Sequence, residues 1–235
     1  LRGFFCIYPP AQRGRSSTLK WCRYNTAMAA IRDILSLPLV YRTWQAPFAQ
    51  GKMKPILKTT DLTKIKRVLD IGCGPGTNAP FFLNNRYLGL DINPRYIRNA
   101  TDRYGSKFTD KGEFKVQDVC HYEPPHNEQY DFILLNSFLH HIDDDNTNAI
   151  LDSLHSILDP NGYIHILDLV LPQRFSIPRV LAKADRGDFA RPLDRWQEIF
   201  SNHFELVQFE PFPLKMLGIS LWQMVYFKGK LKRTA

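Results

Sequence analysis

The sequence lacks several features that would place it in a well-defined class. Its four cysteines, Cys6, Cys22, Cys73 and Cys120, form no CxxC pair and follow no regular spacing. This pattern argues against a disulfide framework and against a zinc site, and it fits a reducing compartment. No apolar run approaches the roughly 20 residues of a membrane span, so we expect no transmembrane segment. Internal repeats and low-complexity stretches are absent as well.

The body of the chain lacks basic character, although the net charge is +8. Residues 1–27 contain five basic residues and no acid, and the last eight residues, KGKLKRTA, contain four more. Subtracting these two contributions from +8 leaves −1 for the residues between them. Charge concentrated at the two ends indicates tails and not a basic groove, so we expect no nucleic-acid partner.

Residues 1–27 differ in composition from the rest of the chain. They are rich in Arg and Ser, and PPAQRGRSS interrupts any amphipathic helix. Because the chain begins with Leu1, the segment can be a fragment, a processed product or a translation from an upstream position. We favour an upstream artefact over a mitochondrial-type targeting segment and treat the region as an uncertain N-terminal extension. We therefore expect a cytoplasmic protein, or a mitochondrial one if the extension is a genuine targeting segment.

Strand and helix patterns follow one another along the rest of the chain as in an α/β protein. From Met28 to about Lys58 the apolar residues recur at helical spacing, and Pro38 and Pro47 are expected to divide this region into short helices. Beyond it, strands are expected at 66–71, 87–92, 113–119, 130–138 and 162–170, and helices at 76–84, 94–104, 144–158 and 192–202. This alternation predicts a doubly wound, mostly parallel sheet.

The last part of the chain departs from that alternation. Residues 204–212 and 221–229 have the pattern of two strands, with no helix-length segment between them. We therefore expect an antiparallel hairpin on the far edge of the sheet. The sequence DPNG at 159–162 predicts a turn before the fifth strand.

The segment VLDIGCGPGT, residues 68–77, joins the end of a predicted strand to three glycines, Gly72, Gly74 and Gly76. Glycines at such a turn let a ligand lie against the backbone, and the amides of the following helix can contact it. A P-loop would require Gly-Lys-Ser/Thr, but Pro-Gly-Thr-Asn follows Gly74, which excludes that class. The dinucleotide fingerprint is GxGxxG, whereas the spacing here is GxGxG. Asp70 suits a ligand with an ammonium group better than one with a pyrophosphate.

The segment DIGCGPGT resembles the first motif of class I S-adenosylmethionine-dependent methyltransferases of the small-molecule type. The resemblance extends through the strand and helix pattern over about residues 60–230. It implies a Rossmann-like methyltransferase fold, a mostly parallel seven-stranded sheet with an antiparallel C-terminal hairpin. It also implies lid helices over residues 28–60, a cofactor-binding domain over 61–230 and S-adenosyl-L-methionine as the cofactor.

The resemblance further implies roles for residues at the strand ends. Asp70 would help to hold the amino acid end of the cofactor, and Asp91 would accept hydrogen bonds from both ribose hydroxyls, although a nicotinamide enzyme places an acid in a similar position. Asp118 would accept from the adenine amino group, unless it is a solvated strand end, and Asn136 would lie near the transferred methyl. The expected cofactor-binding residues are Asp70, Gly72, Gly74, Gly76, Asp91, Ile92, Asp118, Val119 and Asn136.

Two histidines, His140 and His141, follow the fourth predicted strand at the carboxyl edge, where ligands bind in such sheets. A base is needed if the methyl acceptor must lose a proton early, and neutral imidazole suits that task near pH 7. Both are therefore candidate catalytic residues. The alternative is that one of them caps the next helix or shields the cofactor.

We expect no metal ion at the site. The acidic cluster Asp143–Asp145 is explained by the positive N-terminus of the helix that it begins. Four other histidines, His121, His126, His155 and His203, have no supporting pattern, and His165 lies inside a predicted strand.

The resemblance implies that N-terminal helices and a segment after the fifth strand build the acceptor pocket, and the chain has a candidate for each. Residues 36–48 supply Tyr41, Arg42, Trp44 and Gln45, which could close over the cofactor. Residues 171–196 contain five arginines, which either bind an anionic group of the acceptor or form a solvated helix face. Six aromatic residues of the chain either line an apolar pocket or belong to the core. The arginines are Arg174, Arg179, Arg186, Arg191 and Arg195, and the aromatic residues are Phe175, Phe189, Trp196, Phe209, Phe212 and Trp222.

The sequence therefore predicts an enzyme that transfers a methyl group from S-adenosyl-L-methionine to a small-molecule acceptor. An RNA or protein methyltransferase is the nearest alternative. From different classes, the alternatives are a nicotinamide-dependent oxidoreductase, which the GxGxG spacing and Asp70 oppose, and a catalytically silent module that binds the cofactor. The acceptor atom and the oligomeric state cannot be read from the sequence.

Overall fold

The computed structural model describes residues 38–232, apart from positions 110, 120, 121, 123, 125–127 and 186, with side chains from Phe48 onward. The chain divides into two compact units, residues 1–46 and 47–235, and the features below belong to the second, apart from the first nine residues of helix α2 (Pro38–Thr59). The extension 1–27 and the helical pattern at 28–37 lie outside the described residues, as do the side chains of Tyr41, Arg42, Trp44 and Gln45. Among the described helices, none combines the length and apolar character required to cross a membrane.

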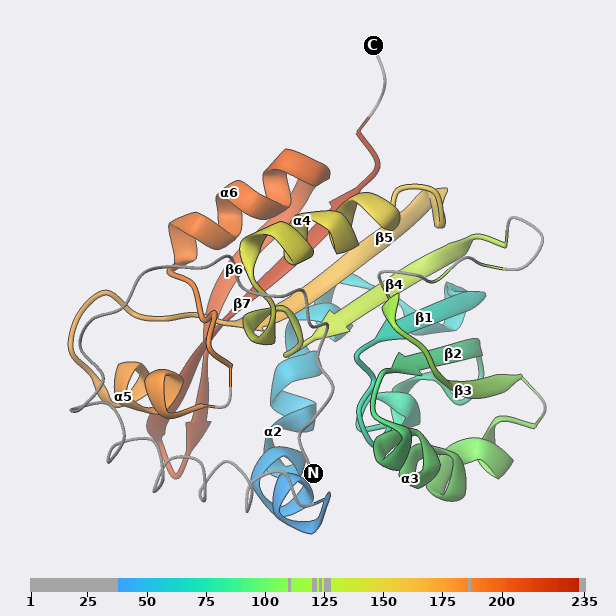
Figure 1. Ribbon diagram of the computed structural model, residues 1–235, viewed down its shortest axis with the longest axis horizontal. Helices are drawn as coiled ribbons and strands as arrows, with labels where there is room; N and C mark the ends of the chain where they lie inside the picture. The colour runs from blue at the N-terminus through green and yellow to red at the C-terminus, as the bar shows by residue number, and fades with distance from the viewer. Residues whose placement is uncertain are drawn as a thin grey trace, which may run out of the picture. The chain divides into compact units, whose positions relative to one another are not determined.

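A seven-stranded sheet forms the centre of the second unit (Figure 1). Its strands lie in the order β3-β2-β1-β4-β5-β7-β6, and β1 to β5 are mutually parallel. Strand β7 runs antiparallel to both β5 and β6, so the C-terminal hairpin forms one edge of the sheet, as predicted. The strands are β1 (Arg67–Ile71), β2 (Arg86–Asp91), β3 (Gly112–Val116), β4 (Tyr130–Asn136), β5 (Leu158–Leu169), β6 (Glu205–Met216) and β7 (Ile219–Lys230).

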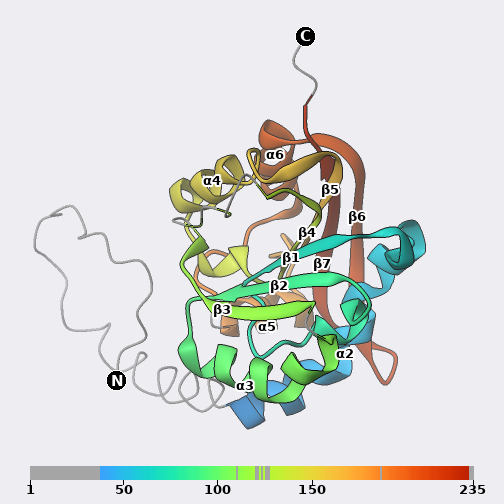
Figure 2. The same ribbon diagram turned by 90° about the vertical axis from the view of Figure 1, so that its right-hand side faces the viewer.

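Helices cover both faces of the sheet (Figure 2). One face packs against α4 and α6 through Leu151 and Trp196, among other fully buried residues. The other face packs against α2 and α3 through residues such as Met53 and Ala100. The helices are α2 (Pro38–Thr59), α3 (Pro94–Tyr104), α4 (Asp144–Ser153), α5 (Ile177–Ala184) and α6 (Leu193–His203). The architecture is the predicted doubly wound α/β fold.

The structure corrects two predicted helix boundaries near prolines. Pro47 does not end a helix but lies inside α2, because Met53 and Ile56 are fully buried and anchor this helix on the sheet. The helix expected at 76–84 is reduced to a 3₁₀ turn, η2 (Ala79–Phe82), after a series of turns. Pro80 lacks a backbone donor, and the side chain of Asn85 donates to the carbonyls of residues 62 and 65, so contacts with an earlier part of the chain hold this turn.

Three further boundaries differ from the prediction. Strand β3 ends at Val116 and not at residue 119, and α4 ends at Ser153 and not at residue 158. The predicted turn at 159–162 lies inside β5, which already starts at Leu158, opposite Tyr130. The pairing shifts register between Tyr130 and Phe132, so the DPNG residues form an irregularity of the strand and not a separate turn.

Candidate active site

The glycine loop follows β1, and all three of its glycines adopt positive φ angles. The values are 66° for Gly72, 55° for Gly74 and 77° for Gly76, a region that side chains disfavour. A Cβ atom at Gly72 would lie 2.5 Å from a ring carbon of Phe138, and one at Gly76 would lie 2.9 Å from a ring carbon of Tyr104. The loop therefore requires glycine both for its backbone shape and for its close packing.

Asp91 lies at the end of β2 and holds the glycine loop directly. One carboxylate oxygen accepts a hydrogen bond from the Gly74 amide at 2.9 Å, and the other accepts from the Asn93 amide at 2.8 Å. Burial raises the pKa of Asp91 above its ordinary value, in spite of the two backbone hydrogen bonds. The side chain is half-buried, so part of it remains accessible to a ligand. The structure thus brings Asp91 and the glycine loop together.

Asp70 lies at the end of β1 and is fully buried. It accepts hydrogen bonds from the Tyr87 hydroxyl at 2.6 Å and from the Asn78 amide at 3.2 Å. Burial raises the pKa of Asp70 to about 7, and these two hydrogen bonds only partly oppose the effect. In this structure Asp70 supports the loop from within the fold, and its contact with the amino acid end of a cofactor stays a prediction.

The raised pKa of Asp70 predicts a pH-dependent stability. Between the unfolded pKa near 4 and the folded pKa of about 7, the folded chain holds a proton that the unfolded chain has lost. Stability should therefore fall as the pH rises through this window, by on the order of 3 kcal/mol. Urea unfolding at pH 5 and pH 8 should show this loss, and Asp70→Asn should remove most of it. Equal pH dependence of the two proteins would contradict the assignment; the exposed Asp102→Asn is the matched control.

A chain of hydrogen bonds connects Asp70 to the end of β4 and to α2. Asn78, which donates to Asp70, accepts from the Asn136 amide at 2.9 Å. The Ser137 hydroxyl donates to Asn136 at 3.2 Å and accepts from the Lys52 ammonium at 2.8 Å. Ser137 itself adopts a φ of 57°, an uncommon conformation for a residue with a side chain. The predicted residue Asn136 thus lies within one polar network with Asp70 and Asn78, which stand on either side of the glycine loop in the sequence.

Lys52 was not singled out in the sequence, and it is nearly fully buried at 9% exposure. Burial lowers its pKa to about 8, while the carboxylates of Asp185 and Asp168 act in the opposite direction. Its position close to the end of β4 depends on how α2 packs on the sheet. No local pattern distinguishes it from the exposed Lys54 and Lys58 of the same helix.

His140 forms a buried pair with Asp168, which lies at the end of β5. The Nδ1 atom of His140 and a carboxylate oxygen of Asp168 are 2.6 Å apart, and both side chains are almost completely buried. Burial alone would raise the pKa of Asp168, but the His140 ring and the amides of Leu169 and Leu139 hold it below its ordinary value. The second ring nitrogen of His140, Nε2, lies 3.8 Å from Asp185. The carboxylate therefore fixes the orientation of the imidazole.

His141 lies beside His140, but the hydrogen bond to Asp168 is made by His140. Its ring centroid lies 4.1 Å from that of His140, and its side chain is half-buried. Both histidines belong to a short 3₁₀ helix, η6 (Leu139–His141). The structure therefore separates the two candidates, because the contact with Asp168 belongs to His140.

The segment after α5 packs against His140. A Cβ atom at Gly187 would lie 2.2 Å from the His140 ring, and the Phe189 amide donates to the His140 carbonyl at 3.0 Å. Arg191 then ties this segment to η6, because its guanidinium donates to the carbonyls of Leu139 and Ile142. Residues 187–191 thus fix the surroundings of the buried imidazole.

The described arginines of the predicted set have different contacts in the structure. Arg191 and Arg195 both pair with Asp144, and Arg179 donates to the carbonyl of Pro172. Arg174 is exposed, and Arg186 lies outside the described residues. Among the predicted aromatic residues, Trp196 and Trp222 are core, whereas Phe175 is 89% exposed.

The remaining predicted cofactor residues lie at the end of β2 and after β3. Ile92 is 39% exposed and directly follows Asp91. The Gln117 amide donates to the Asp91 carbonyl at 3.1 Å, which brings the half-buried Asp118 close to the end of β2. Val119 is buried. The predicted strand ends thus meet at one edge of the sheet, and the binding roles of these residues stay predictions.

Sequence reasoning missed the partners that orient the predicted residues. These are Lys52, Asn78, Tyr87, Asp168 and Asp185. Asp168 ends the fifth predicted strand, in the same position as Asp70 and Asp91 on their strands, and this position was the available signal. The other four have no sequence signal, because their partners lie far away along the chain.

Comparison with known proteins gives a family match over part of the chain and a fold match over most of it. Residues 69–164 match the family described as a methyltransferase domain. No curated protein matches the chain. Among solved structures, the chain is similar to the N-methyltransferase NodS from Bradyrhizobium japonicum in complex with S-adenosyl-L-homocysteine, at 14% identity and a TM-score of 0.65. That match covers 88% of this chain and 98% of NodS.

Two further structures resemble the chain over part of their own length. The mitomycin 7-O-methyltransferase has 17% identity and a TM-score of 0.64, over 81% of this chain and 55% of that protein. A riboflavin-derivative dimethyltransferase from Streptomyces davawensis has 19% identity and a TM-score of 0.60, over 85% of this chain and 62% of that protein. The chain thus spans only about half of the mitomycin enzyme. Residues 69–164 thus match a methyltransferase domain, and the fold over most of the chain is that of solved methyltransferases.

Proposed function

We propose that the chain transfers a methyl group from S-adenosyl-L-methionine to a small-molecule acceptor. The observation that carries this proposal is the meeting of the glycine loop, Asp91 and the His140–Asp168 pair at the carboxyl ends of β1, β2, β4 and β5. In open α/β sheets this edge is where ligands bind. The similar solved proteins named for small molecules, a mitomycin and a riboflavin derivative, support the acceptor class.

The residues of the loop and strand ends fit the cofactor. Three glycines with positive φ give the loop a tight backbone turn that residues with side chains disfavour, and Asp91 holds this turn through the Gly74 amide. Asp91 is half-buried, and its oxygens retain acceptor capacity for two hydroxyls beyond their two backbone donors. The half-buried Asp118 and the 39% exposed Ile92 offer a polar group and an apolar surface for an adenine ring. At the end of β4, Asn136 donates to Asn78, which follows the glycine loop.

The cofactor supplies an electrophilic methyl group on a sulfonium sulfur. The chain must align the acceptor with that methyl, exclude water and, for a hydroxyl acceptor, remove a proton. His140 is the better base of the two candidates, because Asp168 accepts from Nδ1–H and so leaves the lone pair on Nε2. Asp168 also stabilises the imidazolium that forms when Nε2 takes the proton. His141 then has a shielding role beside it.

Transfer of a labelled methyl group tests the acceptor class. The full chain is incubated with methyl-labelled cofactor and, separately, with a panel of small aromatic hydroxyl and amine compounds, with total RNA and with a protein mixture. Label in small molecules alone is the expected result. Label in RNA or protein and in no small molecule would contradict the acceptor class.

A further inference from the structure

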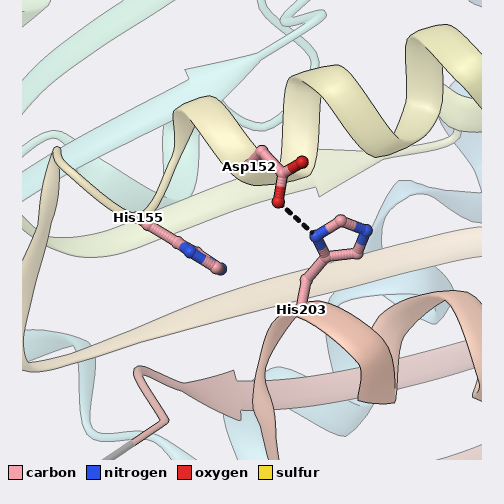
Figure 3. Close-up of side chains that lie close together, drawn as sticks. All are labelled: Asp152, His155 and His203. Atoms are coloured by element: carbon pink, nitrogen blue, oxygen red, sulfur yellow. Dashed lines mark hydrogen bonds and ion pairs between the residues drawn. The ribbon is translucent and has the colours of Figure 1, made fainter. Parts of the chain in front are cut away.

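Three potential metal ligands meet at the C-terminal ends of α4 and α6 (Figure 3). They are Asp152, His155 and His203, and their nearest ligand atoms all lie within 4.8 Å of one another. The sequence pattern gave no reason to connect these two histidines, which are 48 positions apart. The cluster lies at the other end of α4 from Asp144, the residue that pairs with Arg191, and it is separate from the proposed methyl-transfer site.

The spacing along α4 places the donors on one face. Asn148, Asp152 and His155 follow one another at intervals of four and three residues, which is the spacing of neighbours on a helix surface. The His155 amide donates to the Asp152 carbonyl at 3.2 Å and keeps His155 in this register beyond the helix end. His203, the last residue of α6, meets this face from the neighbouring helix.

The contacts of His203 call for a positive species beside it. Its Nδ1 lies 2.8 Å from an oxygen of Asp152, and its Nε2 lies 2.9 Å from the side-chain oxygen of Asn148. A neutral imidazole carries one N–H and cannot donate to both oxygens. When Nε2–H donates to Asn148, the Nδ1 lone pair faces a carboxylate. A proton or a metal ion between Nδ1 and Asp152 resolves this conflict, as does a turned Asn148 amide.

His155 favours the metal ion over the other two arrangements. An extra proton on His203 or a turned Asn148 amide would explain the contacts of His203 without His155. Only a bound metal ion gives the second imidazole, His155, a role as a ligand. The His155 ring is held by edge-on packing on Phe204, with the ring centroids 4.8 Å apart, and it approaches the Asp152–His203 pair (Figure 3). Asn148 then acts as the outer hydrogen-bond acceptor that metal-binding histidines usually have.

We propose that Asp152, His155 and His203 bind a divalent transition-metal ion of the zinc class. Two imidazoles and one carboxylate are a donor set that zinc accepts, with water completing the coordination. Ligands of one tetrahedral zinc ion lie about 3.3 Å apart. The Asp152–His203 pair at 2.8 Å must open slightly, and the more widely spaced donors, which lie within 4.8 Å of one another, must close by up to about 1.5 Å. The carboxylate of Asp152 can do so, because its side chain is 67% exposed. The ion would clamp α4 to α6 on one face of the sheet.

Zinc titration of the full chain, without a histidine tag and stripped of metal by a chelator, tests the proposal. We expect one zinc ion to bind per chain, with a rise in melting temperature. His155→Phe retains the ring that packs on Phe204 but removes the ligand atoms, and it should weaken zinc binding by about 100-fold or more. Asn148→Ala should cost about tenfold. Asp145→Asn changes an exposed carboxylate on the same helix and should leave the affinity unchanged.

Two outcomes would overturn the proposal. The unsubstituted chain would bind no zinc, or the His155→Phe variant would bind it as tightly as the unsubstituted chain. In the second case a proton or a turned amide accounts for the contacts of His203. Circular dichroism of each variant shows that it is folded, and cobalt titration gives an independent signal, since tetrahedral nitrogen and oxygen ligation produces visible absorption. Neither measurement depends on methyl transfer.

Discussion

Replacing Asp91 by alanine is expected to lower the affinity for S-adenosyl-L-methionine by about 100-fold or more. The substitution removes the acceptor proposed for the ribose hydroxyls, and hydrogen bonds to a charged group contribute about 1.5–3 kcal/mol each. It also leaves the amides of Gly74 and Asn93 without their side-chain acceptor, which loosens the glycine loop. Both effects act on the same ligand-binding edge, so binding should suffer more than folding.

Calorimetric titration of the Asp91→Ala variant gives the affinity, and circular dichroism shows that the variant is folded. The matched control is Asp102→Ala, which removes an exposed carboxylate from α3 and should leave the affinity as it is. An unchanged affinity in Asp91→Ala would show that the ribose has been placed at the wrong residue. Equal losses in the two variants would point to a general effect of charge.

Replacing His140 by glutamine is expected to lower turnover of a hydroxyl acceptor by roughly 100-fold to 10,000-fold, the usual contribution of a general base. Glutamine retains an N–H that can donate to the buried Asp168, so the carboxylate need not remain unpaired. It cannot accept the proton, because an amide is not a base at neutral pH. Affinity for the cofactor should remain close to that of the unsubstituted chain.

Comparing the turnover of His140→Gln with that of His141→Gln shows which histidine acts as the general base and which only shields the cofactor. The second variant should retain turnover within about tenfold, because His141 lacks the contact with Asp168 that orients a base. The acidic limb of the pH–rate profile should disappear in His140→Gln and persist in His141→Gln. If neither variant loses turnover at saturating cofactor, the proton-abstraction mechanism is wrong.

The fold was predictable because its signals are local and redundant. The run YDFILLN is apolar almost throughout, and in the structure β4 has a buried neighbour on each side. Asn93-Pro94 marks the start of α3, where the Asn93 side chain accepts from the Arg95 amide. The hairpin of β6 and β7 followed from two strand patterns that lack a connecting helix. Each of these features depends on neighbours in the sequence.

The predicted helix boundaries were wrong where side-chain hydrogen bonds or packing on the sheet decided the structure instead of the local sequence pattern. The segment after the glycine loop is not the expected helix, since Asn78 and Asn85 bond to distant groups and Pro80 lacks a donor. Pro47 lies within α2 because Met53 and Ile56 are buried further along the same helix. Asn78 bonds Asp70, eight positions earlier, but the Asn85 contacts span 20 and 23 positions, and Met53 and Ile56 pack against strands of the sheet, so a short window along the chain does not contain the latter contacts.

The same distinction applies to the site. Sequence reasoning selected the glycines, Asp91 and His140, because these residue types stand at strand ends in a recognisable order. The pairing of His140 with Asp168, 28 residues later, depends on β4 and β5 lying side by side. Lys52 reaches Ser137 across 85 residues for the same kind of reason. Ligand roles of the predicted residues remain to be measured.

Calorimetric titration of the purified full chain with S-adenosyl-L-methionine, S-adenosyl-L-homocysteine and NADH tests the central claim most directly. The account predicts that both adenosyl compounds bind with dissociation constants on the order of micromolar, and that NADH does not bind. That result would support the cofactor residues proposed along VLDIGCGPGT and at Asp91. Binding of NADH with no binding of either adenosyl compound would contradict the account and indicate hydride transfer instead.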